Sequence, residues 1–271
     1  PPLSEGEHAI TVIIEDEAGN QSEPSDEWVI TVDTQAPEAP AIGSVLDDVG
    51  AKTGELTTGD VTDDQQPAFS GTAEAGATVV IYDNGVEIGR VVAENGTWTF
   101  TPEQPLAEGE HSITVQAIDT AGNVSEPSEA FELVVDTTAP EKPVNGPEGT
   151  GIGEIIDDQG SITGPIAEGD VTDDTKPTIK GNGNPGDTII INDNGTKIGE
   201  VEVGEDGTWE FTPETELGEG DHGISVIIQD PAGNQSEPSD EWEITVDTQV
   251  AAPAIGKVID NVGAKTGELS T

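Results

Sequence analysis

The chain has 271 residues, of which 56 are Asp or Glu and 8 are Lys or Arg, and its formal net charge is −48. Such a chain repels phosphate backbones and anionic lipids, so a nucleic-acid partner is excluded and membrane binding is disfavoured. No apolar stretch reaches the roughly 18 residues of a membrane-spanning helix, so we expect no membrane insertion. The absence of cysteine excludes a disulfide scaffold. Stability must therefore come from core packing, with a bound cation as a further candidate.

Three short blocks recur in the same order along the chain. A Gly-acid-His block lies at 6–8, 109–111 and 220–222, followed each time by Asp-X-Ala-Gly-Asn and by Val-Asp-Thr. The spacing of about 100 residues is typical of an independently folding domain. It predicts the end of one repeat, two complete repeats and the start of another, with boundaries at 1–32, 33–135, 136–246 and 247–271. We expect the chain to be an excerpt from a longer polypeptide.

Apolar residues alternate with polar residues in short runs, which indicates β-strands rather than helices. Asn-Gly pairs such as Asn84-Gly85 and Asn194-Gly195 supply the positive φ angles of tight hairpin turns. In the first complete repeat we expect strands at 41–45, 67–73, 78–82, 87–93, 97–101, 111–119 and 130–135. Seven short antiparallel strands predict an Ig-like β-sandwich. The fold class is therefore all-β, with tandem seven-stranded sandwiches in an elongated array.

The four tryptophans fall at positions predicted to face a core. They are Trp28, Trp98, Trp209 and Trp242. A sugar-stacking platform is the alternative role for these rings.

The pattern Asp-X-Ala-Gly-Asn, a strand, then Val-Asp-Thr-X-Ala-Pro resembles the bacterial Ig-like repeats of giant type I-secreted adhesins and biofilm-associated proteins. Shared phrases also occur at 59–64, 70–73 and 96–102. The resemblance covers essentially the whole chain and departs from the pattern at 250–252. It implies a secreted protein of the Gram-negative cell surface, exported unfolded, whose repeats bind calcium near their junctions and form a long stalk for adhesion or biofilm formation.

Calcium takes six to eight oxygen ligands, so several loops must converge to form a site. Because strand directions alternate, we expect loop 119–123 to lie beside Asp33 and stretch 60–64 to lie near Asp136. Loop 230–234 of the next repeat should face Asp136 from the other side. We therefore expect Ca²⁺ as a cofactor at the junction of the two complete repeats. The expected ligands are Asp136, Asp230 and Asn234, with Asp60, Asp63 and Asp64 assisting; partial sites use Asp33, Asp119 and Asn123, and Asp247. Extracellular modules bind calcium at about 10⁻⁴–10⁻³ M, so binding would stiffen the rod after export.

The same residues have a simpler interpretation. Asp and Asn form turns without any metal, so Asp-X-Ala-Gly-Asn is equally consistent with a plain loop between strands. The paired acids at 47–48, 63–64, 157–158 and 173–174 are consistent with solvated loops or with sites inside one domain. His8, His111 and His222 recur at one position without a second nearby His or Cys, so we expect a structural role for them.

An enzyme needs a set of catalytic residues that occurs once in the chain, whereas here the distinctive residues recur in each repeat. We therefore expect no catalysis and a structural stalk. The alternative is a carbohydrate- or receptor-binding Ig-like module, because such sandwiches often bind through their end loops. We expect a monomer that contacts neighbouring repeats of its own chain, while other regions of the adhesin hold the host-cell or biofilm-matrix ligand.

Overall fold

The computed structural model describes residues 2–250, 252, 254, 255, 259, 260, 267 and 268. The chain divides into two compact units. The first holds the described residues up to 141 together with 229–236, and the second holds 142–228 and the described residues after 236. Regular structure in the described residues consists of β-strands, and none of them lies in a helix that could span a membrane.

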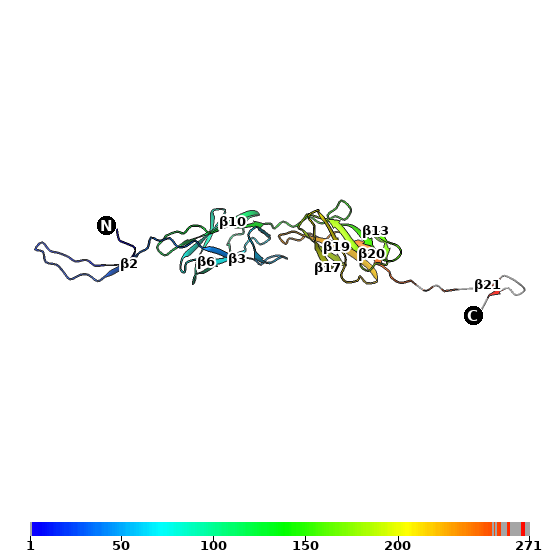
Figure 1. The fold of residues 1–271 in the computed structure, drawn as a ribbon, viewed down its shortest axis with the longest axis horizontal. Helices are drawn as coiled ribbons and strands as arrows, with labels where there is room; N and C mark the ends of the chain where they lie inside the picture. The colour runs from blue at the N-terminus through cyan, green and yellow to red at the C-terminus, as the bar shows by residue number, and fades with distance from the viewer. Residues whose placement is uncertain (1, 251, 253, 256–258, 261–266, 269–271) are drawn as a thin grey trace. The chain divides into compact units, whose positions relative to one another are not determined.

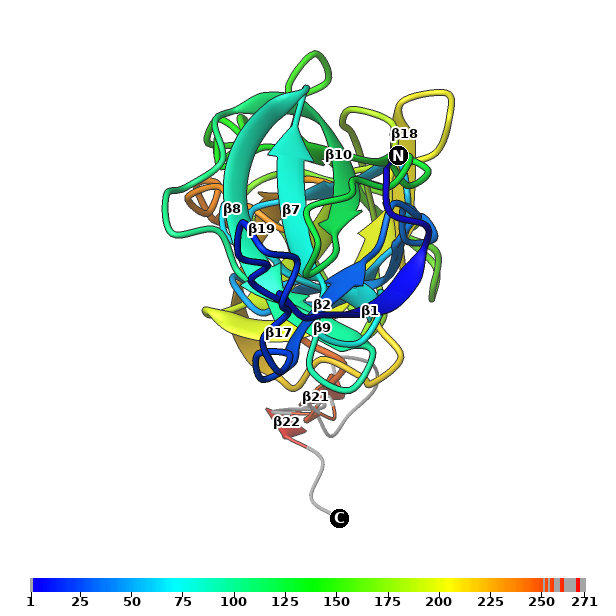
Figure 2. The same cartoon turned by 90° about the vertical axis from the view of Figure 1, so that its left-hand side faces the viewer.

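The sandwich of the first unit consists of two sheets. One sheet has the strand order β4-β3-β6-β9 and the other β5-β11-β10-β7-β8. Neighbouring strands are antiparallel except for β5, which runs parallel to β11. In Figure 2, β7, β8 and β10 form one layer of this sandwich. The strands are β3 (Ala41–Asp47), β4 (Gly54–Leu56), β5 (Asp60–Thr62), β6 (Ala68–Thr72), β7 (Thr78–Asp83), β8 (Val86–Val92), β9 (Thr97–Phe100), β10 (Gly109–Ile118) and β11 (Phe131–Val135).

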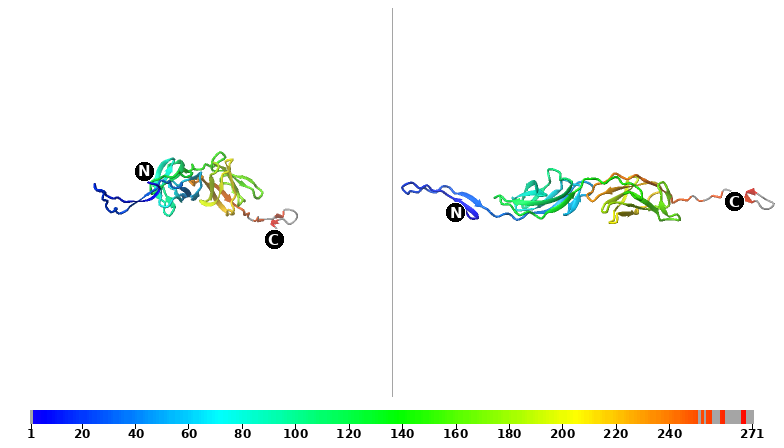
Figure 3. Two further views of the ribbon diagram at one scale, coloured as in Figure 1. Left: turned by 60° about the vertical axis from the view of Figure 1, so that its left-hand side comes forward. Right: turned by 90° about the horizontal axis from the view of Figure 1, so that it is seen from above.

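The second unit repeats this topology. Its sheets have the orders β13-β12-β15-β18 and β14-β20-β19-β16-β17, with β14 parallel to β20. The two sandwiches are labelled in Figure 1, and Figure 3 shows them from two further directions. The strands are β12 (Ile152–Asp157), β13 (Gly164–Ile166), β14 (Val171–Thr172), β15 (Thr178–Asn182), β16 (Thr188–Asp193), β17 (Thr196–Glu202), β18 (Thr208–Phe211), β19 (Gly220–Gln229) and β20 (Trp242–Val246).

Each sandwich closes its own hydrophobic core. Alternate residues of facing strands point inward, so the buried side chains come from both sheets. The first core contains Val45, Phe69, Ile81, Ile113 and Leu133, each at most 1% exposed. In the second core, the fully buried side chains include Ile155, Ile179, Ile189, Ile191 and Ile224. The sequence prediction of all-β Ig-like sandwiches in tandem is thus confirmed.

The first sandwich has two strands that the sequence did not predict. The seven predicted runs all form strands, and β4 and β5 add two more, each three residues long. Neither is long enough to show an alternating pattern. The pairing of β5 with β11 depends on a contact between residues far apart in the sequence, so the hydrophobic pattern carries no signal for it.

The first described segment forms a two-stranded ribbon of β1 (Gly6–Ile10) and β2 (Trp28–Val32), shown at the blue end of Figure 1. Its pairing of Gly6 with Val32 matches that of Gly109 with Val135 in the first sandwich. The predicted core position of Trp28 is wrong, since this residue is 74% exposed. Trp98 and Trp209 are 3% exposed, as predicted, because a second sheet covers them.

The fragment predicted at 247–271 is described only in part. Within it, β21 (Ile259–Asp260) pairs with β22 (Gly267–Glu268). The remaining predictions for residues 251, 253, 256–258, 261–266 and 269–271 lie outside the described residues.

Candidate functional site

A buried Asp-Thr-Asp cluster lies at one end of the first sandwich. Thr62 at the end of β5 donates its hydroxyl to Asp47 Oδ2 at 2.5 Å, and the backbone N–H of Asp64 donates to Thr62 Oγ1 at 3.1 Å. Asp47 and Asp64 are 4% and 3% exposed. These acids therefore belong to the interior of one sandwich, which excludes the solvated-loop interpretation for them.

The second sandwich contains the same cluster. Asp157 Oδ2 accepts a hydrogen bond from the Thr172 hydroxyl at 2.6 Å, and the N–H of Asp174 donates to Thr172 Oγ1 at 3.0 Å. These two threonines were not among the site residues predicted from the sequence. The sequence does carry a signal for them, because a Thr stands two residues before the second aspartate of the pairs 63–64 and 173–174.

Among the described residues of the first unit, three carboxylate oxygens are buried without a hydrogen-bond partner. They are Asp63 Oδ1, Asp64 Oδ2 and Asp83 Oδ1, and the carboxylate of Asp83 is already paired with His111 through Oδ2. Burial raises the pKa of Asp63, and the negative charges of Asp47, Asp230 and Asp64 raise it further. Burial likewise raises the pKa of Asp64. An unpartnered buried carboxylate among like charges is costly, and a cation is the group that would offset the cost.

The loop at 230–234 brings together the three principal residues of the predicted site. Asp230 Oδ1 accepts hydrogen bonds from the N–H groups of Gly233 and Asn234, both at 2.9 Å. The Asn234 side-chain amide donates to Asp230 Oδ2 at 3.0 Å and to the Asp136 carbonyl at 2.7 Å. The Lys52 ammonium donates to the Pro231 carbonyl at 2.7 Å. Loop 229–236 is thus held within the first unit by contacts with residues 52 and 136.

The loop at 119–123 has the same internal geometry. Asn123 donates its side-chain amide to Asp119 Oδ2 at 2.8 Å and to the Asp33 carbonyl at 3.1 Å. The Asn123 side chain holds the pKa of Asp119 below its ordinary value. The structure therefore brings Asp33, Asp119 and Asn123 together, and most of the hydrogen-bonding capacity of this aspartate is used by its own loop.

The side chains of Asp136, Asp247 and Asp60 cap turns. Asp136 Oδ1 accepts from the N–H of Thr138 at 3.0 Å, and Asp247 Oδ1 accepts from the N–H of Gln249 at 3.0 Å. Asp60 Oδ2 accepts from the N–H of Thr57 at 2.7 Å. The N–H of Asp136 donates to the Thr62 carbonyl at 2.9 Å, so the acidic stretch 60–64 does lie next to this junction aspartate.

Among the described residues, no group of three or more His, Cys, Asp or Glu side chains is arranged so that it could hold a metal ion. The donor set nevertheless fits a hard cation in one respect. Calcium is coordinated by carboxylate, amide and backbone carbonyl oxygens. The free oxygens of Asp63 and Asp64 are carboxylate oxygens. The residues that fit a cation best are therefore these two.

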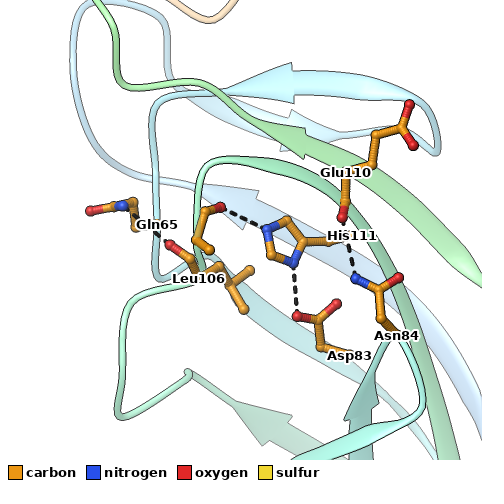
Figure 4. A network of polar contacts seen from close by, with 7 residues as sticks. Gln65, Asp83, Asn84, Leu106, Glu110 and His111 are labelled. Carbon is orange, nitrogen blue, oxygen red and sulfur yellow. Dashed lines mark hydrogen bonds and ion pairs between the residues drawn. The ribbon is translucent and has the colours of Figure 1, made fainter.

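The recurring histidines make structural contacts. His111 Nδ1 lies 2.8 Å from Asp83 Oδ2, and Nε2 lies 2.7 Å from the Ala107 carbonyl (Figure 4). The neighbouring Asn84 amide donates to the Glu110 carbonyl at 3.2 Å, which ties the β7–β8 turn to β10. His222 makes the same two contacts, with Asp193 Oδ2 at 2.8 Å and the Gly218 carbonyl at 2.9 Å.

The two sandwiches coincide with two matches to one family model. The model describes a bacterial Ig-like domain and matches residues 40–137 and 152–248. The chain belongs to the bacterial Ig-like domain family. The clusters Asp47-Thr62-Asp64 and Asp157-Thr172-Asp174 thus occupy equivalent places in two bacterial Ig-like repeats.

Several solved structures are similar to these bacterial Ig-like repeats. Fibronectin(III)-like modules of Clostridium thermocellum CbhA share 17% identity and a TM-score of 0.43, over 78% of this chain and 98% of theirs. A tetra-tandem repeat from the extending region of a large adhesion protein shares 17% identity, with a TM-score of 0.31, over 91% and 58% of the two chains. The BSP domain of a biofilm associated protein shares 20% identity, with a TM-score of 0.26, over 72% and 30%. No curated protein sequence matches the chain.

Proposed function

We propose that the chain is a structural spacer segment of a large bacterial cell-surface adhesin. Two complete sandwiches in series, each with its own closed core, carry this proposal. Repeats of this kind add length to a polypeptide while each domain folds by itself. Their distinctive polar clusters recur at equivalent positions, which supports a mechanical role over catalysis, since an active site is built once.

The proposed location is the bacterial cell surface after type I secretion. The absence of cysteine and the net charge of −48 are compatible with export of an unfolded chain that folds outside the cell. The chain would be monomeric, and its contacts would be with neighbouring repeats of the same polypeptide. Other regions of the adhesin would bind the host cell or the biofilm matrix.

We further propose that calcium neutralises the acidic residues of the first unit. The free oxygens of Asp63 and Asp64 are the primary candidate ligands. Asp230 lies near enough to Asp63 to raise its pKa, and Asn234 links Asp230 to Asp136 by hydrogen bonds. Loop 229–236 belongs by sequence to the second repeat, so an ion held here would restrain consecutive repeats. Calcium would supply the positive charge that the cluster lacks, while the Asn234 amide positions Asp230 by its hydrogen bond.

Thermal unfolding with and without calcium tests this proposal. We expect millimolar calcium to raise the unfolding temperature of the wild-type chain and Asp63→Asn to remove most of that rise. Asp173→Asn is the matched control, since Asp173 occupies the equivalent position in the second sandwich but is exposed. If Asp63→Asn and the wild type respond equally to calcium, this ion does not bind at the proposed residues.

A further inference from the structure

The second sandwich carries a groove on the outer face of one sheet, with a volume of about 770 Å³. Its floor is formed by β12, β15 and β18, and its rims by Pro147 and by the turn between β17 and β18. The volume is within the range of about 300–1,000 Å³ that is usual for ligand sites. The groove lies entirely within the second unit.

A row of charged side chains crosses the floor. Glu154, Lys180 and Glu210 are directly paired across the three strands, with Lys180 Nζ 3.0 Å from Glu210 Oε2. Side chains alternate between the two faces of a strand, and the neighbouring Ile179 and Trp209 are buried in the core, so this row faces outward. In the first sandwich, the corresponding row is Ser44, Ser70 and Thr99. The charges are therefore specific to the second repeat.

One rim is built by a segment that the first repeat lacks. The stretch between Asp136 and Asp157 is longer than the corresponding stretch between Asp33 and Asp47. The additional residues fold back on themselves, with the N–H of Gly151 donating to the Val144 carbonyl at 2.9 Å. The Asn182 amide donates to the Pro147 carbonyl at 3.1 Å and so fixes this segment to β15. The rim is thus held by defined contacts.

The opposite rim adds further negative charge. Glu202 and Asp206 line it, and Asp206 Oδ1 accepts hydrogen bonds from the N–H and hydroxyl of Thr208 at 3.1 and 2.8 Å. The lining thus contains the carboxylates of these two residues and of Glu154 and Glu210, against the single ammonium of Lys180. Gly153, Gly181 and Gly204 also line the groove.

We propose that this groove binds an extended peptide segment of another protein that carries lysine or arginine side chains. The excess of carboxylates over Lys180 is complementary to a cationic ligand. Trp209 is 3% exposed, so the groove lacks the open aromatic face on which a sugar ring would stack. The inference goes beyond the spacer function and does not depend on it.

The test is a titration of the full chain with a short peptide in which lysine alternates with serine, at physiological salt. Backbone amide NMR signals report where the peptide binds, and fluorescence anisotropy gives the affinity. We expect saturable binding with the largest shifts at Gly153, Gly181 and Gly204. The variant Glu154→Gln/Glu210→Gln should weaken binding about fivefold or more, since each exposed charge pair contributes up to about 1 kcal/mol.

The control removes the same number of charges away from the groove. Glu216→Gln/Glu243→Gln changes two exposed glutamates of the same unit and should leave the affinity nearly unchanged. Equal weakening by both double variants would overturn the proposal, since it would indicate attraction to the net charge alone. Shifts spread over both sandwiches, or no binding at all, would also overturn it. Unchanged unfolding temperatures establish that the variants are folded.

Discussion

Asp63 and Asp173 occupy the same position in successive repeats but have different surroundings. Each carboxylate lies against a glycine with positive φ, since a Cβ on Gly50 or Gly160 would fall about 2 Å from an aspartate oxygen. Asp63 is partly buried and has an oxygen without a partner, whereas Asp173 is exposed. The repeat motif alone therefore does not determine the electrostatics of this position. The contacts of loop 229–236 within the first unit make the difference.

The histidine contacts lead to a pH-dependent prediction. Burial alone would lower the pKa of His222, but the bonds to the Gly218 carbonyl and Asp193, with the charges of Asp193 and Asp221, raise it above its ordinary value. A raised folded-state pKa stabilises the fold fully below about pH 6.5, and this contribution is lost as the pH rises through the folded value. We therefore expect the second sandwich to lose stability as the pH rises from about 6.5 through the folded-state pKa of His222.

The measurement is an NMR titration of the His222 ring together with thermal unfolding at a series of pH values. Asp193→Asn should lower the ring pKa and flatten the pH dependence of the unfolding temperature. A His222 ring that titrates at or below its ordinary value in the wild type would contradict the prediction.

The packing of the strands depends on a few glycines at which the backbone closely approaches other residues. A Cβ on Gly71 of β6 would lie 1.9 Å from the Ala41 carbonyl oxygen and 2.7 Å from Cζ2 of Trp98. We expect Gly71→Ala to lower the free energy of unfolding by about 1–3 kcal/mol, because the core cannot accept the added methyl group without a shift. Gly218→Ala is the control, since nothing lies within 4 Å of a Cβ there. Urea denaturation of both variants measures the difference, and equal effects would show that Gly71 is not tightly packed against Ala41 and Trp98.

Much of the fold could be predicted from the sequence because the alternation of apolar residues survives in both repeats. Val79 and Ile81 identify the inward face of β7, and the positive φ values of 48° at Asn84 and 79° at Gly85 match the predicted turn. The strands β4 and β5 could not be predicted, since each has only three residues and β5 is defined by its parallel partner.

The candidate site could be predicted only in part. Recurrence of Asp-X-Ala-Gly-Asn identified Asp230 and Asn234, and strand direction placed them with Asp136. The sequence could not indicate that Asp64 is buried while Asp60 caps an exposed turn, because both stand in one acidic stretch. The burial of Asp64 follows from the hydrogen bonds around Thr62 in the folded sandwich.

The whole molecule combines two self-contained cores with a chain in which 56 Asp and Glu residues outnumber 8 Lys and Arg residues. At a net charge of −48, carboxylates of successive repeats repel one another over a Debye length of about 8 Å at physiological salt. Core packing stabilises each sandwich but does nothing to offset this repulsion. A divalent cation would offset it, which links the free oxygens of Asp63 and Asp64 to the mechanical role proposed for the chain.

Small-angle X-ray scattering of the chain with millimolar calcium and then with excess chelator tests this account most directly. We predict a larger radius of gyration and maximum dimension with calcium, which decrease when the ion is removed and the restraint between consecutive repeats is lost. Asp173→Asn should behave like the wild type, and Asp63→Asn should resemble the chelated state in both conditions. Scattering curves of the wild type that superimpose with and without calcium would contradict the account.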